Sequence, residues 1–146
     1  MPDKKINRKI AVIFATDVVG YSKHMEANES ETILNLRECE AILIGLFSKY
    51  EGRLFNKGGD SFLAEFPSAV SAVECAVEFQ NAIKERNSND DPSVKLDFRI
   101  GINSGDVVIE NENLLGDGVN IAARLEALSQ TGGVTISKSI HDFVKG

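Results

Sequence analysis

The sequence predicts an α+β domain with a central, mainly antiparallel sheet flanked by helices. Three observations predict it: a short apolar run near the N-terminus, two segments with helical spacing of apolar residues, and strand-like segments separated by glycine-containing turns. The chain has 146 residues, 42% of them hydrophobic, which suits one globular unit with a substantial core. We therefore expect residues 1–146 to form a single domain.

The N-terminal half alternates strand and helix signals. Residues 10–15 are a continuous apolar run, short enough for a strand that is buried on both faces. Residues 30–50 carry apolar side chains every three or four positions, the spacing of an amphipathic helix. Residues 53–56 and 61–66 predict two strands around the turn Lys57-Gly58-Gly59-Asp60, whose glycines allow positive φ.

The next segments continue this alternation. Pro67-Ser68 opens a second amphipathic helix, which the polar segment 87–92 ends. Residues 96–102 alternate apolar and polar side chains, as a half-buried strand does. Ser104-Gly105 then predicts a two-residue hairpin turn into a strand at 107–109.

The C-terminal part adds smaller elements. Residues 118–128 predict a short helix, residues 134–136 a strand, and Ser137 the N-cap of a last helical turn. The first six elements, in the order β-α-β-β-α-β, match the ferredoxin-like plan. Because a helix has only just begun where the chain stops, we expect the domain to lack its last strands.

Composition and charge restrict the partners. A formal net charge of −6 argues against binding through phosphate neutralisation, so no nucleic-acid partner is expected. A polyanionic substrate would need a cation between itself and this acidic chain, and a divalent metal is the natural candidate. Cys39 and Cys75 are expected to be reduced, since neither a cysteine framework nor a signal peptide accompanies them. No apolar run approaches the ~20 residues of a membrane span, so we expect no membrane insertion by this segment and a cytoplasmic location.

Two aspartates lie where strands end. Asp17 follows the first strand, and Asp60 lies in the turn between the next two. In a ferredoxin-like sheet the first strand lies beside that hairpin, so the two side chains can meet at one edge. Hard divalent cations take carboxylate oxygens and leave other positions to water and phosphates, and two such ions can clamp an in-line displacement. Taken singly, each aspartate also fits an ordinary strand end or turn.

A second pair of polar residues lies on the predicted helix 118–128. Asn120 and Arg124 are four positions apart and therefore share one helix face. An amide and a planar, permanently charged guanidinium suit a phosphoryl group that is gaining charge. The alternative is a solvated face on which Arg124 pairs with a nearby carboxylate.

Taken together, these segments resemble the class III adenylate/guanylate cyclase catalytic domain. The matching stretches follow the family's order and fall at residues 14–22, 58–63, 98–105 and 116–124. The resemblance implies a nucleotidyl cyclase fold and an intracellular signalling enzyme. Its reaction would convert a nucleoside triphosphate, with ATP favoured, to a 3′,5′-cyclic monophosphate and pyrophosphate.

The resemblance also implies a site shared between two chains. Asp17, Asp60 and the backbone carbonyl of Val18 would hold two Mg²⁺ or Mn²⁺ ions. Backbone amides at Gly20 and Tyr21 would bind the β and γ phosphates.

The remaining groups would come from the second subunit of a head-to-tail homodimer. There Asn120 would orient the ribose, and Arg124 would meet the charge of the transition state. Regulatory domains would lie elsewhere in a longer parent chain.

Several positions depart from the family pattern. Asn56 stands where ATP-using members commonly carry a lysine; Lys57 is one residue late and would point to the opposite face of its strand. Asn113 stands where such members often carry an aspartate, so Asn56 and Asn113 could face either purine. ATP is favoured because neither the Glu nor the Cys typical of guanine-specific members is present. Asp106 replaces a basic residue found in many members, and a phosphate-contacting lysine of the family would lie beyond Gly146.

Two alternatives stay open. One is a catalytically weak or silent nucleotide-binding module that dimerises and regulates. The other is a diguanylate cyclase, because residues 58–62 resemble the signature turn of that enzyme class. It is less favoured because residues 116–124 have no counterpart there and Ser61 replaces an acidic residue.

Overall fold

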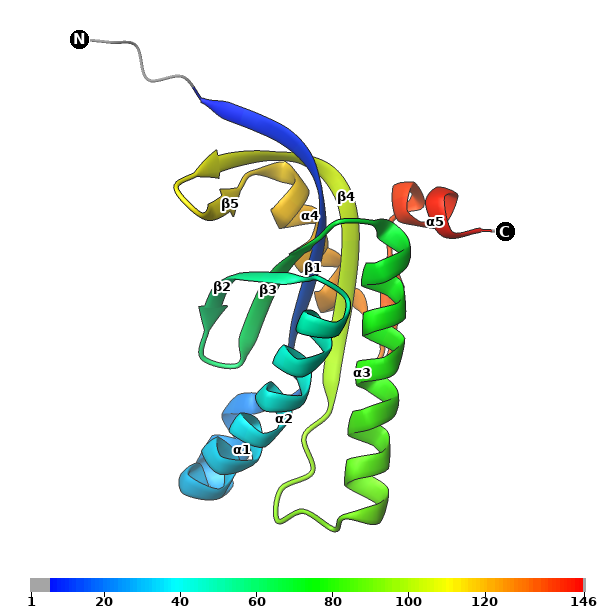
Figure 1. The fold of residues 1–146 in the computed structure, drawn as a ribbon. Helices are drawn as coiled ribbons and strands as arrows, with labels where there is room; N and C mark the ends of the chain where they lie inside the picture. Colours follow the sequence, from blue (N-terminus) through cyan, green and yellow to red (C-terminus); the bar gives the residue numbers. More distant parts are fainter. Residues whose placement is uncertain (1–5, 146) are drawn as a thin grey trace, which may run out of the picture.

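The computed structural model describes residues 6–145 as one sheet with helices on both of its faces (Figure 1). In chain order the elements are β1 (Asn7–Val18), α1 (Tyr21–Ala27), α2 (Glu29–Lys49), β2 (Arg53–Gly58), β3 (Ser61–Phe66), α3 (Ala69–Asn89), β4 (Phe98–Glu110), β5 (Asn113–Leu115), α4 (Asp117–Leu128), β6 (Val134–Ile136) and α5 (Lys138–Val144). The sheet order is β2-β3-β1-β4-β5, and β6 pairs with β4. Only the β4–β6 pairing is parallel among these strands, so the predicted α+β class and mainly antiparallel sheet are confirmed.

The sheet separates two hydrophobic clusters. The larger lies under α2 and α3, where the rings of Phe14, Phe47 and Phe66 pack with centroids 5.3–5.6 Å apart. The smaller lies under α4 and includes Ile13 and Val107. Successive side chains of a strand point to opposite faces, so Phe14 enters one cluster and Ile13 the other. The central strand β1 is therefore covered on both faces from Ala11 to Ala15, whereas Ile10, the first residue of the predicted apolar run, is 74% exposed.

The hairpin predicted at Ser104-Gly105 is wrong. Strand β4 continues from Phe98 to Glu110, and β1 pairs along it through both residues. Gly105 lies where α4 crosses the strand, and the close approach there depends on Gly118, on which a Cβ would lie 2.6 Å from the carbonyl oxygen of Asp106. The true reversal comes later, at Asn111, whose positive φ of 57° lets β4 fold back onto β5.

Other predicted element boundaries also differ from those in the structure. The first strand is longer than its apolar run, and α1, which begins after Gly20 at φ 66°, was not predicted. The predicted N-cap is present, since Ser137 accepts a hydrogen bond from the amide of Ile140; Ser68 caps α3 in the same way, by accepting from the amide of Ser71. Cys39 and Cys75 are free and fully buried, which confirms that both are core residues.

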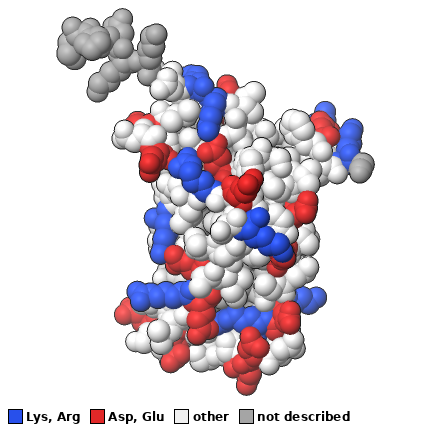
Figure 2. Space-filling model, in the orientation of Figure 1, with Lys and Arg blue, Asp and Glu red and all other residues white. Residues whose placement is uncertain are grey.

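The surface is mixed in charge. On the face shown in Figure 2, lysine and arginine side chains are interspersed with aspartate and glutamate, and neither sign forms a large continuous area. Of the helices within residues 6–145, none has the length and apolar character needed to cross a membrane.

Candidate active site

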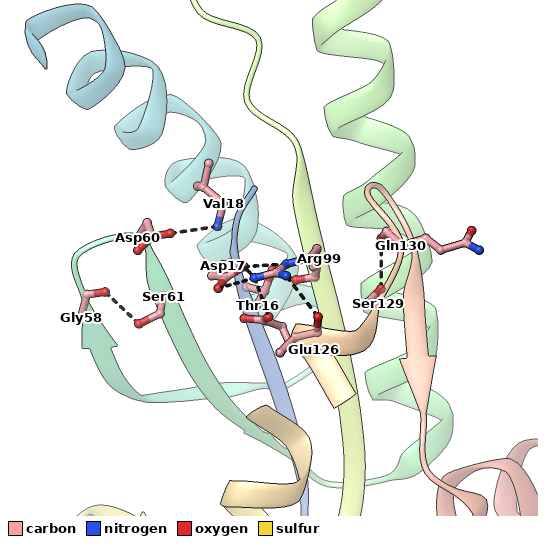
Figure 3. Close-up of polar contacts among 11 residues, drawn as sticks. Thr16, Asp17, Val18, Gly58, Asp60, Ser61, Arg99, Glu126, Ser129 and Gln130 are labelled. Atoms are coloured by element: carbon pink, nitrogen blue, oxygen red, sulfur yellow. Dashed lines mark hydrogen bonds and ion pairs between the residues drawn. The ribbon is translucent and has the colours of Figure 1, made fainter. Parts of the chain in front are cut away.

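The two predicted aspartates meet at the end of β1. The Oδ2 atom of Asp60, in the β2–β3 turn, accepts a hydrogen bond of 3.2 Å from the amide of Val18, the residue after Asp17 (Figure 3). Burial raises the pKa of Asp60 above its ordinary value, and the negative charge of Asp17 adds to the rise. The antiparallel pairing of β1 with β3 thus brings together two carboxylates that are far apart in the sequence.

Asp17 is held by an arginine that the sequence did not single out. Asp17 and Arg99 are direct partners in the β1–β4 register. The guanidinium donates from Nη2 to both carboxylate oxygens, at 3.1 and 3.2 Å, and from Nε at 3.3 Å (Figure 3). The side chains of Arg99 and Asp17 are only 29% and 23% exposed, so the pair is shielded from solvent more than a surface ion pair is.

A third carboxylate, Glu126, joins this cluster from α4. Its Oε2 lies 3.3 Å from Nη2 of Arg99, and its side chain is 9% exposed. Burial, with Asp17 next to it, raises the pKa of Glu126 to about 8, and the charge of Arg99 only partly opposes that rise. Glu126 follows Val119 and Ala122 at helical spacing on the buried face of α4, and this spacing could have marked its position as buried but not its partners.

Small residues let α4 lie directly on β4. A Cβ on Gly101 would fall 2.8 Å from the Cα of Glu126, and one on Gly118 would fall 2.6 Å from the carbonyl oxygen of Asp106. Between these contacts, the side-chain amide of Asn103 donates to the carbonyl of Gly118 at 3.0 Å. The helix is therefore fixed along the strand that carries Arg99.

Asn120 and Arg124 lie on the outer face of this helix. Both are exposed, and Arg124 makes no ion pair with any residue in the described part of the chain. At about 100° per residue, Arg124 points roughly 200° away from Glu126, whose side chain faces Asp17. The structure therefore does not bring Asn120 and Arg124 to the aspartates of their own chain.

Gly20 and Tyr21 lie in the segment after β1, three and four residues after Asp17. Gly20 adopts the left-handed conformation and precedes α1, whose first turn has no side-chain cap. The amide of Val19 donates to the carbonyl of Asp97 at 2.8 Å, which fixes the start of this turn. The side chain of Tyr21 packs against the larger core.

A β-bulge determines which way Asn56 points. The β2–β3 register shifts between Leu54 and Asn56, so Asn56 pairs with Leu63, which packs on the α4 side of the sheet. Lys57 lies on the opposite face, as predicted, where its Nζ forms a 2.7 Å ion pair with Glu40 of α2.

Asn113 lies at the start of β5. Its side-chain oxygen accepts a hydrogen bond of 3.0 Å from the amide of Leu114. The side-chain NH₂ of Asn113 is the group that this contact leaves for another acceptor.

The chemistry of the donor set suits Mg²⁺ or Mn²⁺. Within residues 6–145 there is no group of three or more His, Cys, Asp or Glu side chains arranged to hold a metal ion. Two carboxylates, Asp17 and Asp60, with the backbone carbonyl of Val18 fit cations that keep several positions for water and substrate phosphates.

The sheet order β2-β3-β1-β4 is that of a ferredoxin-like domain, and two carboxylates lie at the end of its central strand β1. The chain belongs to the Adenylate and Guanylate cyclase catalytic domain family, whose sequence model matches residues 3–146.

Known proteins show how close the similarity is. "Putative adenylate cyclase 3" of Rhizobium meliloti (strain 1021) is 44% identical in an alignment of 147 positions that covers 100% of this chain and 25% of that protein. The crystal structure of an adenylate/guanylate cyclase/hydrolase from Silicibacter pomeroyi has a TM-score of 0.82 at 36% identity, covering 94% of this chain and 81% of that one. The adenylyl cyclase CyaB from P. aeruginosa has a TM-score of 0.83 at 25% identity, covering 97% and 83%. The chain thus spans a quarter of its Rhizobium relative.

Proposed function

We propose that this domain converts a nucleoside triphosphate, with ATP favoured, to a 3′,5′-cyclic monophosphate and pyrophosphate in intracellular signalling. The observation that carries the proposal is the convergence of Asp60 on the end of β1, beside Asp17, in a chain of the cyclase family. That convergence supplies two carboxylates at one sheet edge, which is what a site for divalent cations beneath a triphosphate requires.

Asp17, Asp60 and the carbonyl of Val18 would hold two Mg²⁺ or Mn²⁺ ions. When bound, these ions supply positive charge that offsets the charge developing on the phosphoryl oxygens. The amides of Gly20 and Tyr21 would bind the β and γ phosphates at the uncapped start of α1.

The other half of the site would come from a second copy of the chain. Asn120 and Arg124 point away from the aspartates of their own chain, so a head-to-tail homodimer is the arrangement that lets them act. There Asn120 would orient the ribose, and its 3′-oxygen would attack the α-phosphorus as the bond to pyrophosphate breaks. Arg124 would stabilise the charge of that transition state.

The preference for ATP draws on named relatives and on the absence of the Glu and Cys typical of guanine-specific members. Relatives from Rhizobium meliloti and Streptomyces coelicolor carry the name adenylate cyclase, at 44% and 29% identity. The bulge turns Asn56 to the α4 side, where it could recognise a purine together with Asn113. We also propose a cytoplasmic location and regulatory domains in a longer parent chain, in line with the quarter of the Rhizobium relative that this chain spans.

The test is a direct assay for product. The full-length protein is incubated with Mn²⁺ and either ATP or GTP, and nucleotides are separated by chromatography. Cyclic monophosphate formed faster from ATP supports the proposal. Nucleotide binding without product from either nucleotide would instead favour the silent regulatory module.

A further inference from the structure

Arg99 is the most heavily coordinated cation near the proposed site. Its guanidinium donates to both oxygens of Asp17, lies 3.3 Å from Oε2 of Glu126 and donates to the carbonyl of Ala127 at 3.2 Å. Asp17 lies on β1, whereas Glu126 and Ala127 lie at the C-terminal end of α4. One side chain thus connects the strand that bears the proposed metal ligand to the helix that bears Asn120 and Arg124.

We propose that Arg99 is a positioning residue: it orients the carboxylate of Asp17 for metal binding and limits how tightly the metal binds. The inference rests on the proposed function, since it assigns Asp17 to a metal. It adds a residue that is neither one of the proposed ligands nor one of the groups proposed to meet the substrate.

The geometry implies that Arg99 and a metal ion compete for the carboxylate of Asp17. A guanidinium that engages both oxygens of a carboxylate uses the same lone pairs that a divalent cation needs. It also places a positive charge next to that cation, which lowers the cation's affinity, and partial burial weakens the screening of this repulsion. A metal ion must therefore displace Arg99 from the carboxylate of Asp17 or share that carboxylate with it.

Arg99 can position the carboxylate of Asp17 because Arg99 is itself held rigidly. The carboxylate of Asp17 is held across the strand pair by a planar, forked donor whose own orientation is fixed by α4. A misplacement of about 1 Å in a catalytic constellation can lower turnover by ~10²-fold. Removing Arg99 should consequently change affinity and turnover in opposite directions.

The experiment compares Arg99→Gln and Arg99→Lys with the wild-type protein. Mn²⁺ binding is measured without nucleotide by electron paramagnetic resonance, turnover is measured with saturating Mn²⁺, and stability is measured by thermal unfolding. Arg99→Gln should bind Mn²⁺ about tenfold more tightly, because the competing charge is gone, yet its kcat should fall ~10–10²-fold. Arg99→Lys keeps the charge but loses the fork, so its Mn²⁺ affinity should stay near wild type while its kcat falls.

Arg53→Gln is the matched control. Arg53 also donates to one carboxylate, that of Glu65, and to one backbone carbonyl, that of Glu112, but at an exposed edge of the sheet. Its substitution should leave Mn²⁺ affinity unchanged.

The outcomes separate this inference from the proposed function. Asp17→Ala, measured in parallel, should remove a Mn²⁺ site that the wild-type protein has. If the wild-type protein binds Mn²⁺ through Asp17 but Arg99→Gln binds it equally or more weakly, the role of Arg99 is wrong and the metal site stands. If neither the wild-type protein nor any variant binds Mn²⁺, the proposed metal site and the role of Arg99 are both wrong.

Discussion

Asp60 combines a structural hydrogen bond with a charge that the fold disfavours. Its Oδ2 fixes the amide of Val18, while burial and the nearby Asp17 raise its pKa. A carboxyl group whose folded pKa is raised costs stability once the pH exceeds that of ordinary ionisation, because the folded state then carries a charge that the unfolded state bears more easily. The carboxylate is therefore kept in a position where it lowers stability at neutral pH, as is common at functional sites.

The substitution Asp60→Asn separates these two contributions. An amide oxygen can still accept from Val18, so the melting temperature at pH 7 should stay equal or rise. Turnover that depends on divalent metal should fall by more than ~10²-fold, since a ligand charge is lost. Asp142→Asn, an exposed isosteric control on α5, should change neither quantity much; activity near wild type in Asp60→Asn would exclude Asp60 as a metal ligand.

The two buried thiols give a prediction about pH. Burial raises the pKa of Cys39 to about 11 and that of Cys75 to about 12, from an ordinary value of 9.0. Unfolding above pH 9 therefore releases protons, so stability should be fully present below about pH 9 and decline as the pH rises toward 11–12.

Two measurements check this prediction. At pH 8 the folded protein should react with a thiol reagent at least ~10³-fold more slowly than the unfolded chain, because the thiolate forms only on opening. Urea unfolding of a Cys39→Ala, Cys75→Ala variant should show a flatter loss of stability between pH 9 and 11. Fast labelling of the native protein would contradict the buried environment.

At the scale of single residues, the sequence could indicate some of the proposed site residues and not others. Asp17 and Asp60 could be predicted because each lies at the end of a recognisable strand or in a turn. Arg99 and Glu126 could not, because their partners depend on the β1–β4 register and on where α4 lies, both of which are tertiary features. In the sequence, Arg99 is only a polar residue of an alternating strand.

At the scale of elements, glycine determines how closely α4 approaches the sheet. Ser104-Gly105 predicts a turn from sequence because Gly is common in hairpins, yet Gly105 lies within β4 under the start of the helix. A glycine in a strand can mean a turn or a close approach by another backbone, and local sequence does not distinguish the two. The order of the major elements could nevertheless be predicted, since their hydrophobic periodicity is local.

Gly101→Ala tests that close approach. The added methyl group would overlap the backbone of Glu126 and Ala122, so α4 must shift away from β4. We expect a loss of about 2–3 kcal/mol in the free energy of unfolding, measured in urea, together with reduced turnover. Gly45→Ala is the control: Gly45 lies in α2 with nothing within 4 Å of the added Cβ, so it should gain roughly 0.5–1 kcal/mol. An equal effect of both substitutions would contradict the role given to Gly101.

At the scale of the whole molecule, the residues proposed for the site face two different directions in one chain. Asp17 lies on the inner side of α4, next to Arg99 and Glu126, whereas Arg124 lies exposed on the outer side. Neither half can reach the other within the chain without moving α4, which Gly101 and Asn103 hold to β4. The proposed symmetric dimer would resolve this conflict, because each chain would give its carboxylates to one site and its arginine to the other.

Mixing two inactive variants tests this arrangement. Asp17→Ala and Arg124→Ala proteins should each be nearly inactive alone. In an equal mixture that exchanges subunits, half of the dimers are mixed and one of the two sites in each is intact, so activity should recover to roughly a quarter of wild type.

The control mixture combines Asp17→Ala with Asp60→Ala, which damage the same half-site, so no mixed dimer has an intact site and activity should not recover. Subunit exchange is checked by native mass spectrometry of chains that carry different tags. Mixed dimers without recovery in the first mixture would place Arg124 outside the partner's site. Recovery in the control mixture would separate Asp17 from Asp60, because it requires each aspartate to act in a different site.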